Sequence, residues 1–293
     1  MSTSARLTVI EKEARARFVR KSRLADVDGT LLDSRTRSSG GAAEALALLA
    51  REQIPLVLCS SKTRAELEVV QQQLAIRHPF VCENGGGVFV PRGYFARGVP
   101  NARDIAGYEA VELGRPYAEV VGALHRIAAR TRVGVIGFSD MSIEEVAFAC
   151  DMPLMQARLA KLREYDEPFR ILDASPSARS RLFNALHAAH LGCTNGGRYE
   201  HVGADVDKGV GVDMLRLLYA RGRGRLISIG LGDALNDVAL LRAVDVPIVV
   251  RNDDTAATPR LLAKVPTARV TSQAGVAGWA EAIGEVVQSR GVR

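Results

Sequence analysis

The segment from Asp26 to Asp33 carries two carboxylates two positions apart, followed directly by a Gly-Thr pair. In an extended chain the side chains of Asp26 and Asp28 point to the same side. Carboxylate and carbonyl oxygens are the ligands that Mg²⁺ prefers, and Gly29 lets the backbone turn tightly beside them. Taken alone, the segment fits equally well a polar junction between a strand and a loop that caps a helix.

Three further polar clusters follow expected strands or open expected helices. They are Ser60-Ser61-Lys62-Thr63 after the apolar run 54–59, Lys208 at the start of an expected helix that continues past Tyr219, and Asp233-Ala234-Leu235-Asn236-Asp237 after the strand expected at 226–229. Because ligands of open parallel sheets bind outside the carboxyl ends of the strands, we expect all four clusters at one edge. Thr63 with Glu66 also forms a capping-box pattern for the helix at 63–74, which is compatible with a phosphate site.

Carboxylates, one lysine and one hydroxyl together suit phosphoryl transfer. Carboxylates can hold a metal, the metal and the lysine offset charge on the phosphoryl oxygens, and a free carboxylate can attack phosphorus. Other chemistries fit less well, because the sequence has no Walker loop and no G-x-S-x-G elbow. Gly230-x-Gly232 lacks the third glycine of a dinucleotide fingerprint, and His187 with His190 is more typical of an ordinary helix surface than of a metal site.

The elements that must position these clusters alternate between strands and helices. This pattern predicts an α/β fold, a doubly wound, Rossmann-like parallel sheet with an inserted α+β cap domain. We expect an N-terminal extension at 1–23, a discontinuous core at 24–86 and 191–293, and the cap at 87–190. The strand expected before Asp26 is unusual, because Leu24 and Ala25 are its only adjacent apolar residues, whereas central parallel strands are normally apolar throughout.

Composition narrows the function classes. The chain has 293 residues, which is typical of about two domains, and a net charge of +6. This charge permits anionic partners, but the arginines are scattered and aromatic residues make up only 5%, which argues against nucleic-acid binding. The four cysteines form no C-x-x-C pair, and no apolar run reaches the length of a membrane span. We therefore expect a cytoplasmic protein that binds neither nucleic acid nor membranes. We also expect a monomer or a homodimer.

The motifs DVDGTLLDS, LVLCSSKT, DKG and GLGDALND resemble, in order and spacing, the four signatures of the haloacid dehalogenase-like hydrolases. The long insert between the second and third motifs resembles the large α/β cap of the subgroup that contains sugar phosphatases. More narrowly, LCSSKT, ENGG and the segment ARLAKLREYDEPF resemble the mannosyl-3-phosphoglycerate phosphatases.

The resemblance implies a role for each matching residue. Asp26 would be the nucleophile that forms an aspartyl-phosphate, and Asp28 the general acid and base. Ser60 and Lys208 would bind the transferring phosphoryl group. The implied Mg²⁺ ligands are Asp26, Asp28 through its carbonyl, Asp233 and, as a ligand or a neighbour of one, Asp237.

The implied substrate contacts lie in the core and in the cap. They are Ser61, Lys62, Asn84, Arg163, Glu167, Arg170, Arg198 and Asn236. Arginine forks suit the carboxylate of a glycosyl-phosphoglycerate. Two of these residues have a structural alternative, because Arg163 could instead pair with Glu167 at the i+4 position and Arg170 could be solvated.

The resemblance implies a Mg²⁺-dependent phosphatase that converts mannosyl-3-phosphoglycerate to mannosylglycerate, a compatible solute. Two alternatives stay open. One is a broader sugar-phosphate phosphatase or one that acts on the glucosyl analogue, because the orientation of one hydroxyl depends on cap geometry. The other is a non-catalytic module that binds a phosphorylated ligand.

Overall fold

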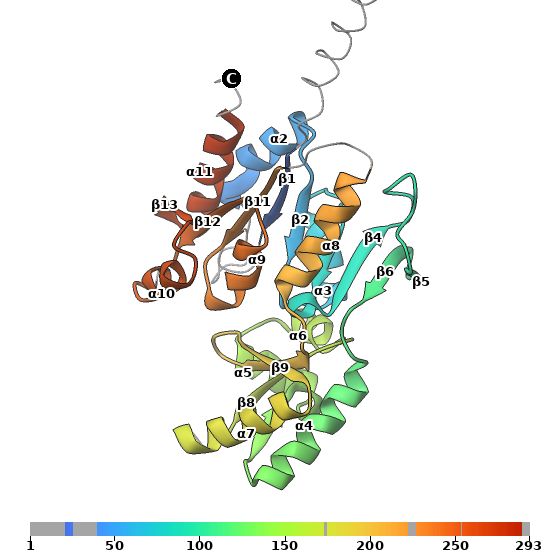
Figure 1. Cartoon of the computed structure of the whole chain (residues 1–293), viewed down its shortest axis with the longest axis vertical. Coiled ribbons are helices and arrows are strands. Elements are labelled where there is room, and N and C mark those ends of the chain that lie inside the picture. Colours follow the sequence, from blue (N-terminus) through green and yellow to red (C-terminus); the bar gives the residue numbers. More distant parts are fainter. Residues whose placement is uncertain (1–20, 26–39, 173–174, 222–226, 253, 289–293) are drawn as a thin grey trace, which may run out of the picture.

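The computed structural model describes residues 21–25, 40–172, 175–221, 227–252 and 254–288 (Figure 1). Within these ranges the strands form one sheet of nine strands and one of four. In spatial order the larger sheet contains β13 (Arg269–Ala274), β12 (Val246–Arg251), β11 (Ile227–Gly232), β1 (Lys21–Ala25), β2 (Leu56–Cys59), β3 (Phe80–Cys82), β4 (Gly87–Pro91), β6 (Tyr108–Glu112) and β5 (Arg103–Ile105). The smaller sheet contains β7 (Val135–Gly137), β8 (Glu167–Ile171), β10 (Glu200–Ala204) and β9 (Leu191–Asn195).

Helices connect these strands. They are α2 (Ala43–Arg51), α3 (Arg64–Gln73), α4 (Tyr117–Thr131), α5 (Ile143–Cys150), α6 (Leu154–Ala160), α7 (Pro176–Ala188), α8 (Lys208–Ala220), α9 (Val238–Arg242), α10 (Ala257–Lys264) and α11 (Gly275–Gln288). Short 3₁₀ turns are η1 (Gly40–Ala42), η2 (Glu83–Gly85), η3 (Phe138–Asp140) and η4 (Leu235–Asp237). No helix in the described part of the chain is long and apolar enough to cross a membrane.

Strand β1 occupies a central position in the larger sheet. It pairs in parallel with β11 on one side and with β2 on the other, so that Leu24 lies opposite both Gly230 and Val57. Backbone groups make these pairings, which is why a polar sequence can still form the strand. The predicted strand before Asp26 is thus present and begins at Lys21, inside the predicted 1–23 extension, of which residues 1–20 lie outside the described residues.

Helices cover both faces of the larger sheet, as a doubly wound fold requires. Side chains of β2 alternate, so that Leu56 and Leu58 pack toward α2, α3 and α11, while Val57 and Cys59 pack toward α8, α9 and α10. Trp279 of α11 is fully buried in the first of these layers. Together with the parallel pairing of β1, β2, β3, β11, β12 and β13, this confirms the predicted fold class.

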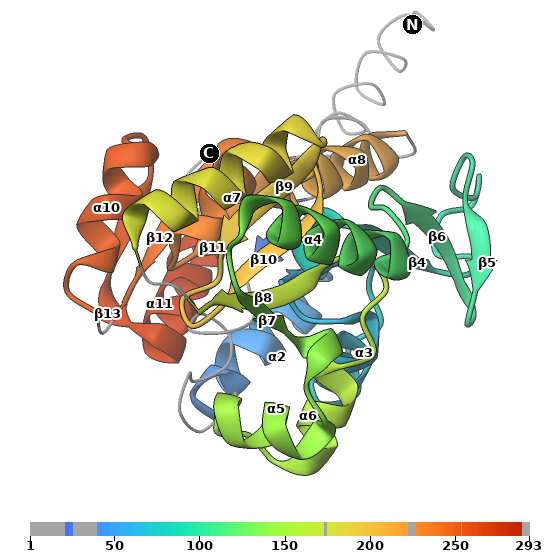
Figure 2. The ribbon, with the colours of Figure 1, turned by 90° about the horizontal axis from the view of Figure 1, so that it is seen from below.

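The four-stranded sheet belongs to the inserted cap. Helices α4 and α7 pack against its face turned away from the core, and α5 and α6 lie to one side (Figure 2). The predicted cap, residues 87–190, does not coincide with the strands of this sheet. Strands β4 to β6 extend the core sheet, and β9 and β10 complete the cap sheet, so the chain crosses between the two near residues 113 and 206. Short strands carry no local signal for the sheet they join, because pairing depends on distant neighbours.

Candidate active site

The carboxyl ends of several parallel strands meet at one edge of the core sheet. Ser60 follows β2, Asp233 follows β11, and Asn252 follows β12. Ser60 and Asp233 are both buried. In the sequence, Asp26 and Asp28 follow the carboxyl end of β1. Both residues lie outside the described part of the chain. The parallel topology therefore brings Ser60 and Asp233, members of two of the predicted clusters, to one edge of the sheet.

The loop from Ser60 to Lys62 is fixed by its own hydrogen bonds. The Ser60 hydroxyl accepts from the Lys62 amide at 3.2 Å. Thr63 caps α3 by accepting from the Glu66 amide at 3.1 Å, and the Glu66 carboxylate accepts from the Thr63 amide at 2.9 Å. The predicted capping box is therefore confirmed. Ser61 and Lys62 are half-buried beside it, and the Lys62 ammonium lies 3.4 Å from Glu66 Oε1.

Lys208 opens α8, where Asp207 caps the helix through the Val210 amide. The Lys208 Nζ lies 2.7 Å from Oδ1 of Asp237, and both side chains are fully buried. The other oxygen of Asp237 accepts from the amides of Asp233 and Ala234, each at 3.1 Å. Both oxygens of Asp237 are thus engaged in holding the lysine and the turn after β11.

Asp233 is another buried carboxylate at this edge. The side-chain amide of Asn252 donates to its Oδ2. This contact orients the carboxylate, whose oxygens are of the kind that Mg²⁺ prefers as ligands. Among the described residues, no group of three or more His, Cys, Asp or Glu is arranged to hold a metal. Two of the predicted ligands, Asp26 and Asp28, lie outside those residues.

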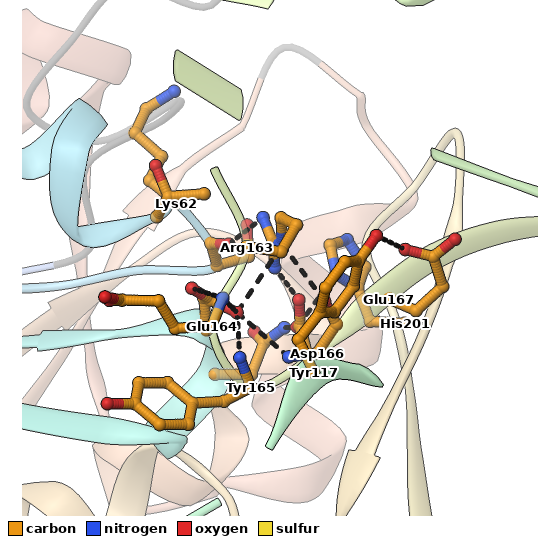
Figure 3. Close-up of polar contacts among 12 residues, drawn as sticks. Lys62, Tyr117, Arg163, Glu164, Tyr165, Asp166, Glu167 and His201 are labelled. Atoms are coloured by element: carbon orange, nitrogen blue, oxygen red, sulfur yellow. Dashed lines mark hydrogen bonds and ion pairs between the residues drawn. The ribbon is translucent and has the colours of Figure 1, made fainter. Parts of the chain in front are cut away.

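A buried polar network joins the core to the cap (Figure 3). The Glu83 carboxylate accepts from the amides of Glu164, Tyr165 and Asp166 at 2.8 to 2.9 Å for the shorter contact of each. Arg163 forms a buried ion pair with Asp166, and its Nε lies 3.5 Å from Glu83 Oε2. Burial raises the pKa of Glu83, and Arg163 and the amide donors oppose that rise. A buried charge network of this kind holds one geometry, because breaking it leaves an unpaired charge.

Asp166 extends the network to Asn84 and His201. Its Oδ2 accepts from the Asn84 side chain at 2.8 Å and contacts Nδ1 of His201 at 3.1 Å. Burial, with nearby Arg163 and Lys208, lowers the pKa of His201 to about 3. The ring is therefore neutral near pH 7, and Nδ1 carries the proton that it donates to the carboxylate. Asn84 thus faces the cap strands through Asp166.

Glu167 is fully buried at the start of β8. Its Oε2 accepts from the Tyr117 hydroxyl at 2.6 Å, and its Oε1 accepts from the Ser139 amide and hydroxyl at 2.8 and 2.7 Å. Burial, followed by the Glu167 hydrogen bond, raises the pKa of Tyr117. The structure therefore places Glu167 inside the cap, with both oxygens occupied.

The remaining predicted substrate residues lie elsewhere. Arg170 and Arg198 line one cap cavity of about 200 Å³ together with Arg179 and Glu200. Arg170 stacks over the Tyr199 ring at 5.9 Å, and Arg198, in the turn between β9 and β10, donates to the Cys150 carbonyl at 3.1 Å. Arg198 was expected in the core, but this turn belongs to the cap sheet. Asn236 lines a separate groove with Thr194 and Asp207.

Comparison with known proteins decides the family. Residues 24–95 match the haloacid dehalogenase-like hydrolases. The glucosyl-3-phosphoglycerate/mannosyl-3-phosphoglycerate phosphatase of Methanococcoides burtonii is 39% identical over 262 residues, covering 89% of this chain and 95% of that protein. The chain belongs to the haloacid dehalogenase-like hydrolases. The predicted resemblance is confirmed, and so, at the level of the family, is a phosphoric monoester hydrolase.

Two further similarities agree with this family. A protein of Persephonella marina with the same name is 36% identical over 228 residues, covering 77% of this chain and 82% of that protein. A solved structure described as a phosphatase of the haloalkanoate enzyme superfamily, from Bacteroides thetaiotaomicron, superposes with a TM-score of 0.65 at 16% identity, covering 92% of this chain and 96% of that one. At that identity the structural match shows the fold alone.

Sequence reasoning missed several residues of this haloacid dehalogenase-like site. Glu83 and Asp166 organise the network between core and cap, and Asn252 orients Asp233. Glu83 directly follows β3 and Asn252 directly follows β12, so position at a strand end was the available signal. Partners such as Glu83 and Asp166 are distant in sequence and could not be paired from it.

Proposed function

We propose that the chain is a Mg²⁺-dependent phosphatase that hydrolyses mannosyl-3-phosphoglycerate to mannosylglycerate and phosphate. The observation that carries this proposal is the 39% identity, over most of both chains, with a phosphatase named for the glucosyl and mannosyl compounds. The edge of the core sheet supports it, because Ser60, Lys208 and Asp233 follow its strands or open the helix beside them.

In the proposed reaction, each of four side chains has a separate role in phosphoryl transfer. An Asp26 carboxylate oxygen attacks phosphorus and the bond from phosphorus to the glycerate oxygen breaks, while Asp28 protonates the leaving alkoxide. Asp28 then takes a proton from water, the water oxygen attacks phosphorus, and the bond to Asp26 breaks to release phosphate. Ser60 donates a hydrogen bond to the phosphoryl oxygens, and Lys208, held by Asp237, offers them positive charge.

Asp233 supports a Mg²⁺ site together with Asp26 and the carbonyl of Asp28. A bound Mg²⁺ would supply positive charge beside the transferring phosphoryl group. We assign Asp237 to the surroundings of that site, since its two oxygens already accept from Lys208 and from two backbone amides.

Substrate recognition is proposed for the cap and for the loop beside Ser60. Arg170 and Arg198 line one cavity, and their guanidinium groups suit a carboxylate. Ser61, Lys62, Asn84 and Asn236 remain candidates for hydroxyl or carboxylate contacts. Arg163 and Glu167 are buried, and their polar atoms already contact other residues of the protein. These contacts favour structural roles for both.

The glucosyl compound is a second candidate substrate, because the names of the Methanococcoides burtonii and Persephonella marina relatives include it. Both sugars would need the same carboxylate and phosphate contacts. We further propose a cytoplasmic enzyme, since the four cysteines, all within the described part of the chain, are thiols rather than disulfides. We propose that it acts as a monomer or homodimer.

Phosphate release from a substrate panel, with and without Mg²⁺, tests the proposal. The panel contains mannosyl-3-phosphoglycerate, glucosyl-3-phosphoglycerate, 3-phosphoglycerate and hexose phosphates. We expect Mg²⁺-dependent release from the glycosyl compounds. A preference for hexose phosphates would replace the substrate assignment, and tight binding of these compounds without any hydrolysis would indicate the non-catalytic module.

A further inference from the structure

Each backbone carbonyl of the loop from Ser60 to Lys62 accepts a hydrogen bond from a different group. The Asn84 amide donates to the Ser60 carbonyl at 3.1 Å, and the Glu83 amide donates to the Lys62 carbonyl at 3.0 Å. The middle carbonyl, that of Ser61, accepts from Nη1 of Arg163 at 3.1 Å. Two of the three donors are therefore core amides. The third is a side chain of residues 163–166, here called the cap segment.

Arg163 has little freedom to move in this position. Its side chain is 3% exposed, its Nε donates to the Asp166 carbonyl at 3.1 Å, and it forms ion pairs with Glu83 and Asp166. Glu83 is equally fixed, because its carboxylate accepts from the amides of three successive cap residues. The guanidinium fork allows one side chain to reach the core loop, Glu83 and Asp166 together, which an ammonium group cannot do.

The same core turn also contacts the start of α8. Gly85 has a φ of +102°, and a Cβ placed there would lie 2.1 Å from the Asp207 carbonyl oxygen. The turn Glu83–Gly85 is therefore packed between the cap segment and the residue that precedes Lys208. Arg163 therefore contacts the loop that carries Ser60 directly, and through Glu83 it contacts the turn that packs against the residue before Lys208.

We propose that Arg163 is a positioning residue that couples the cap to the two phosphoryl-binding elements of the core, and that it does not contact substrate. This inference rests on the proposed phosphatase function. The reason for the coupling is geometric, because phosphoryl transfer requires the binding groups to be held within a fraction of an ångström. Substrate can align only when the cap segment holds the Ser60 loop in place.

Arg163→Lys is the test variant, because it keeps the charge and loses the fork. Arg269→Lys is the matched control, since Arg269 makes an exposed ion pair with Glu285, far from the site in sequence. Two substrates are compared, a glycosyl-3-phosphoglycerate and a small aryl phosphate with no carboxylate. Binding of inorganic phosphate to the Mg²⁺-loaded protein is measured by calorimetry, and all assays run well below the unfolding midpoint of each variant.

We expect Arg163→Lys to lower kcat by roughly 10- to 100-fold on both substrates and to weaken inorganic phosphate binding, with KM for the two substrates changing in parallel. A rise in KM for the glycosyl compound alone, with kcat on the aryl phosphate and phosphate binding unchanged, would show that Arg163 is a substrate ligand and overturn the proposal. A lower unfolding midpoint with unchanged kcat and phosphate binding would reduce it to a purely structural residue and also overturn it.

Asp166→Asn is a milder second variant for the case in which Arg163→Lys does not fold. It removes the ion pair with Arg163 while keeping a side chain of the same shape. We expect a smaller loss of kcat on both substrates, with the same weakening of phosphate binding. If wild-type protein binds phosphate and cleaves the aryl phosphate but ignores glycosyl-phosphoglycerates, the substrate assignment fails while the phosphate-binding comparison still decides the role of Arg163.

Discussion

The Lys208 ammonium and the Asp237 carboxylate form a fully buried ion pair at 2.7 Å, and the second oxygen of Asp237 accepts from the amides of Asp233 and Ala234. One carboxylate therefore fixes both the lysine proposed to bind the phosphoryl group and the turn that carries the proposed metal ligand. Replacing it affects stability and the active site together.

Asp237→Ala is expected to lower the free energy of unfolding by about 3–5 kcal/mol, because it leaves the buried Lys208 charge without its partner. Denaturant unfolding measures this change. Asp213→Ala is the control, since Asp213 pairs with Arg216 at the surface with its side chain 62% exposed, and surface pairs contribute about 0–1 kcal/mol. Equal effects of the two substitutions would contradict the importance of the buried pair.

Asn252→Ala is expected to raise the Kd for Mg²⁺ by roughly 10- to 100-fold, because Asp233 loses the amide that orients it. Titration calorimetry of the protein with Mg²⁺ gives the Kd without any assay of activity. Asn184→Ala, on the exposed side of α7, provides the comparison. An unchanged Kd in Asn252→Ala would mean that Asp233 needs no such support.

The lowered pKa of His201 leads us to expect that the folded state loses stability in acid. Its folded pKa of about 3 lies below the ordinary value of 6.5, because burial disfavours the charged ring. The unfolded chain therefore binds more protons than the folded one, and the stability that the neutral ring contributes is complete above pH 6.5 and lost as pH falls toward 3. Denaturant unfolding at several pH values should show a steeper loss for wild type than for His201→Gln. Parallel curves would contradict a neutral, buried imidazole.

Gly85→Ala tests the close contact between the core turn and the residue before Lys208. The new Cβ would meet the Asp207 carbonyl, and the positive φ adds backbone strain of about 1–3 kcal/mol. Gly93→Ala is the matched control, because Gly93 has a φ of +74° and no atom of the described residues lies within 4 Å of a Cβ placed there. We expect Gly85→Ala to be clearly the more destabilising in thermal unfolding and to lower phosphate affinity, whereas similar losses would show that only the backbone angle matters.

The fold class and the strand-end positions of Ser60 and Asp233 were predictable from the sequence. Apolar runs such as 54–59 mark buried parallel strands, and the polar residue after each run must then lie at the carboxyl edge. The capping box of α3 was predictable because its hydrogen bonds join residues three positions apart.

The partners of Arg163 were not predictable. Helix α6 ends at Ala160, so the i+4 spacing from Arg163 to Glu167 has no helical geometry to act through. Arg163 instead pairs with Asp166 and with Glu83, which is 80 positions away in the sequence. The sequence also does not show which sheet β4, β5 and β6 join, because the alternation of apolar and polar residues within a strand does not identify its partner strand.

Hydrolysis of a glycosyl-3-phosphoglycerate is the most direct measurement of the central claim. Purified protein with Mg²⁺ is predicted to release phosphate from mannosyl- or glucosyl-3-phosphoglycerate, and Asp26→Asn to lower kcat by at least about a thousandfold while still binding phosphate. Full activity in Asp26→Asn would contradict the proposed nucleophile. Absence of phosphate release from both glycosyl compounds, by folded Mg²⁺-loaded protein, would contradict the proposed function itself.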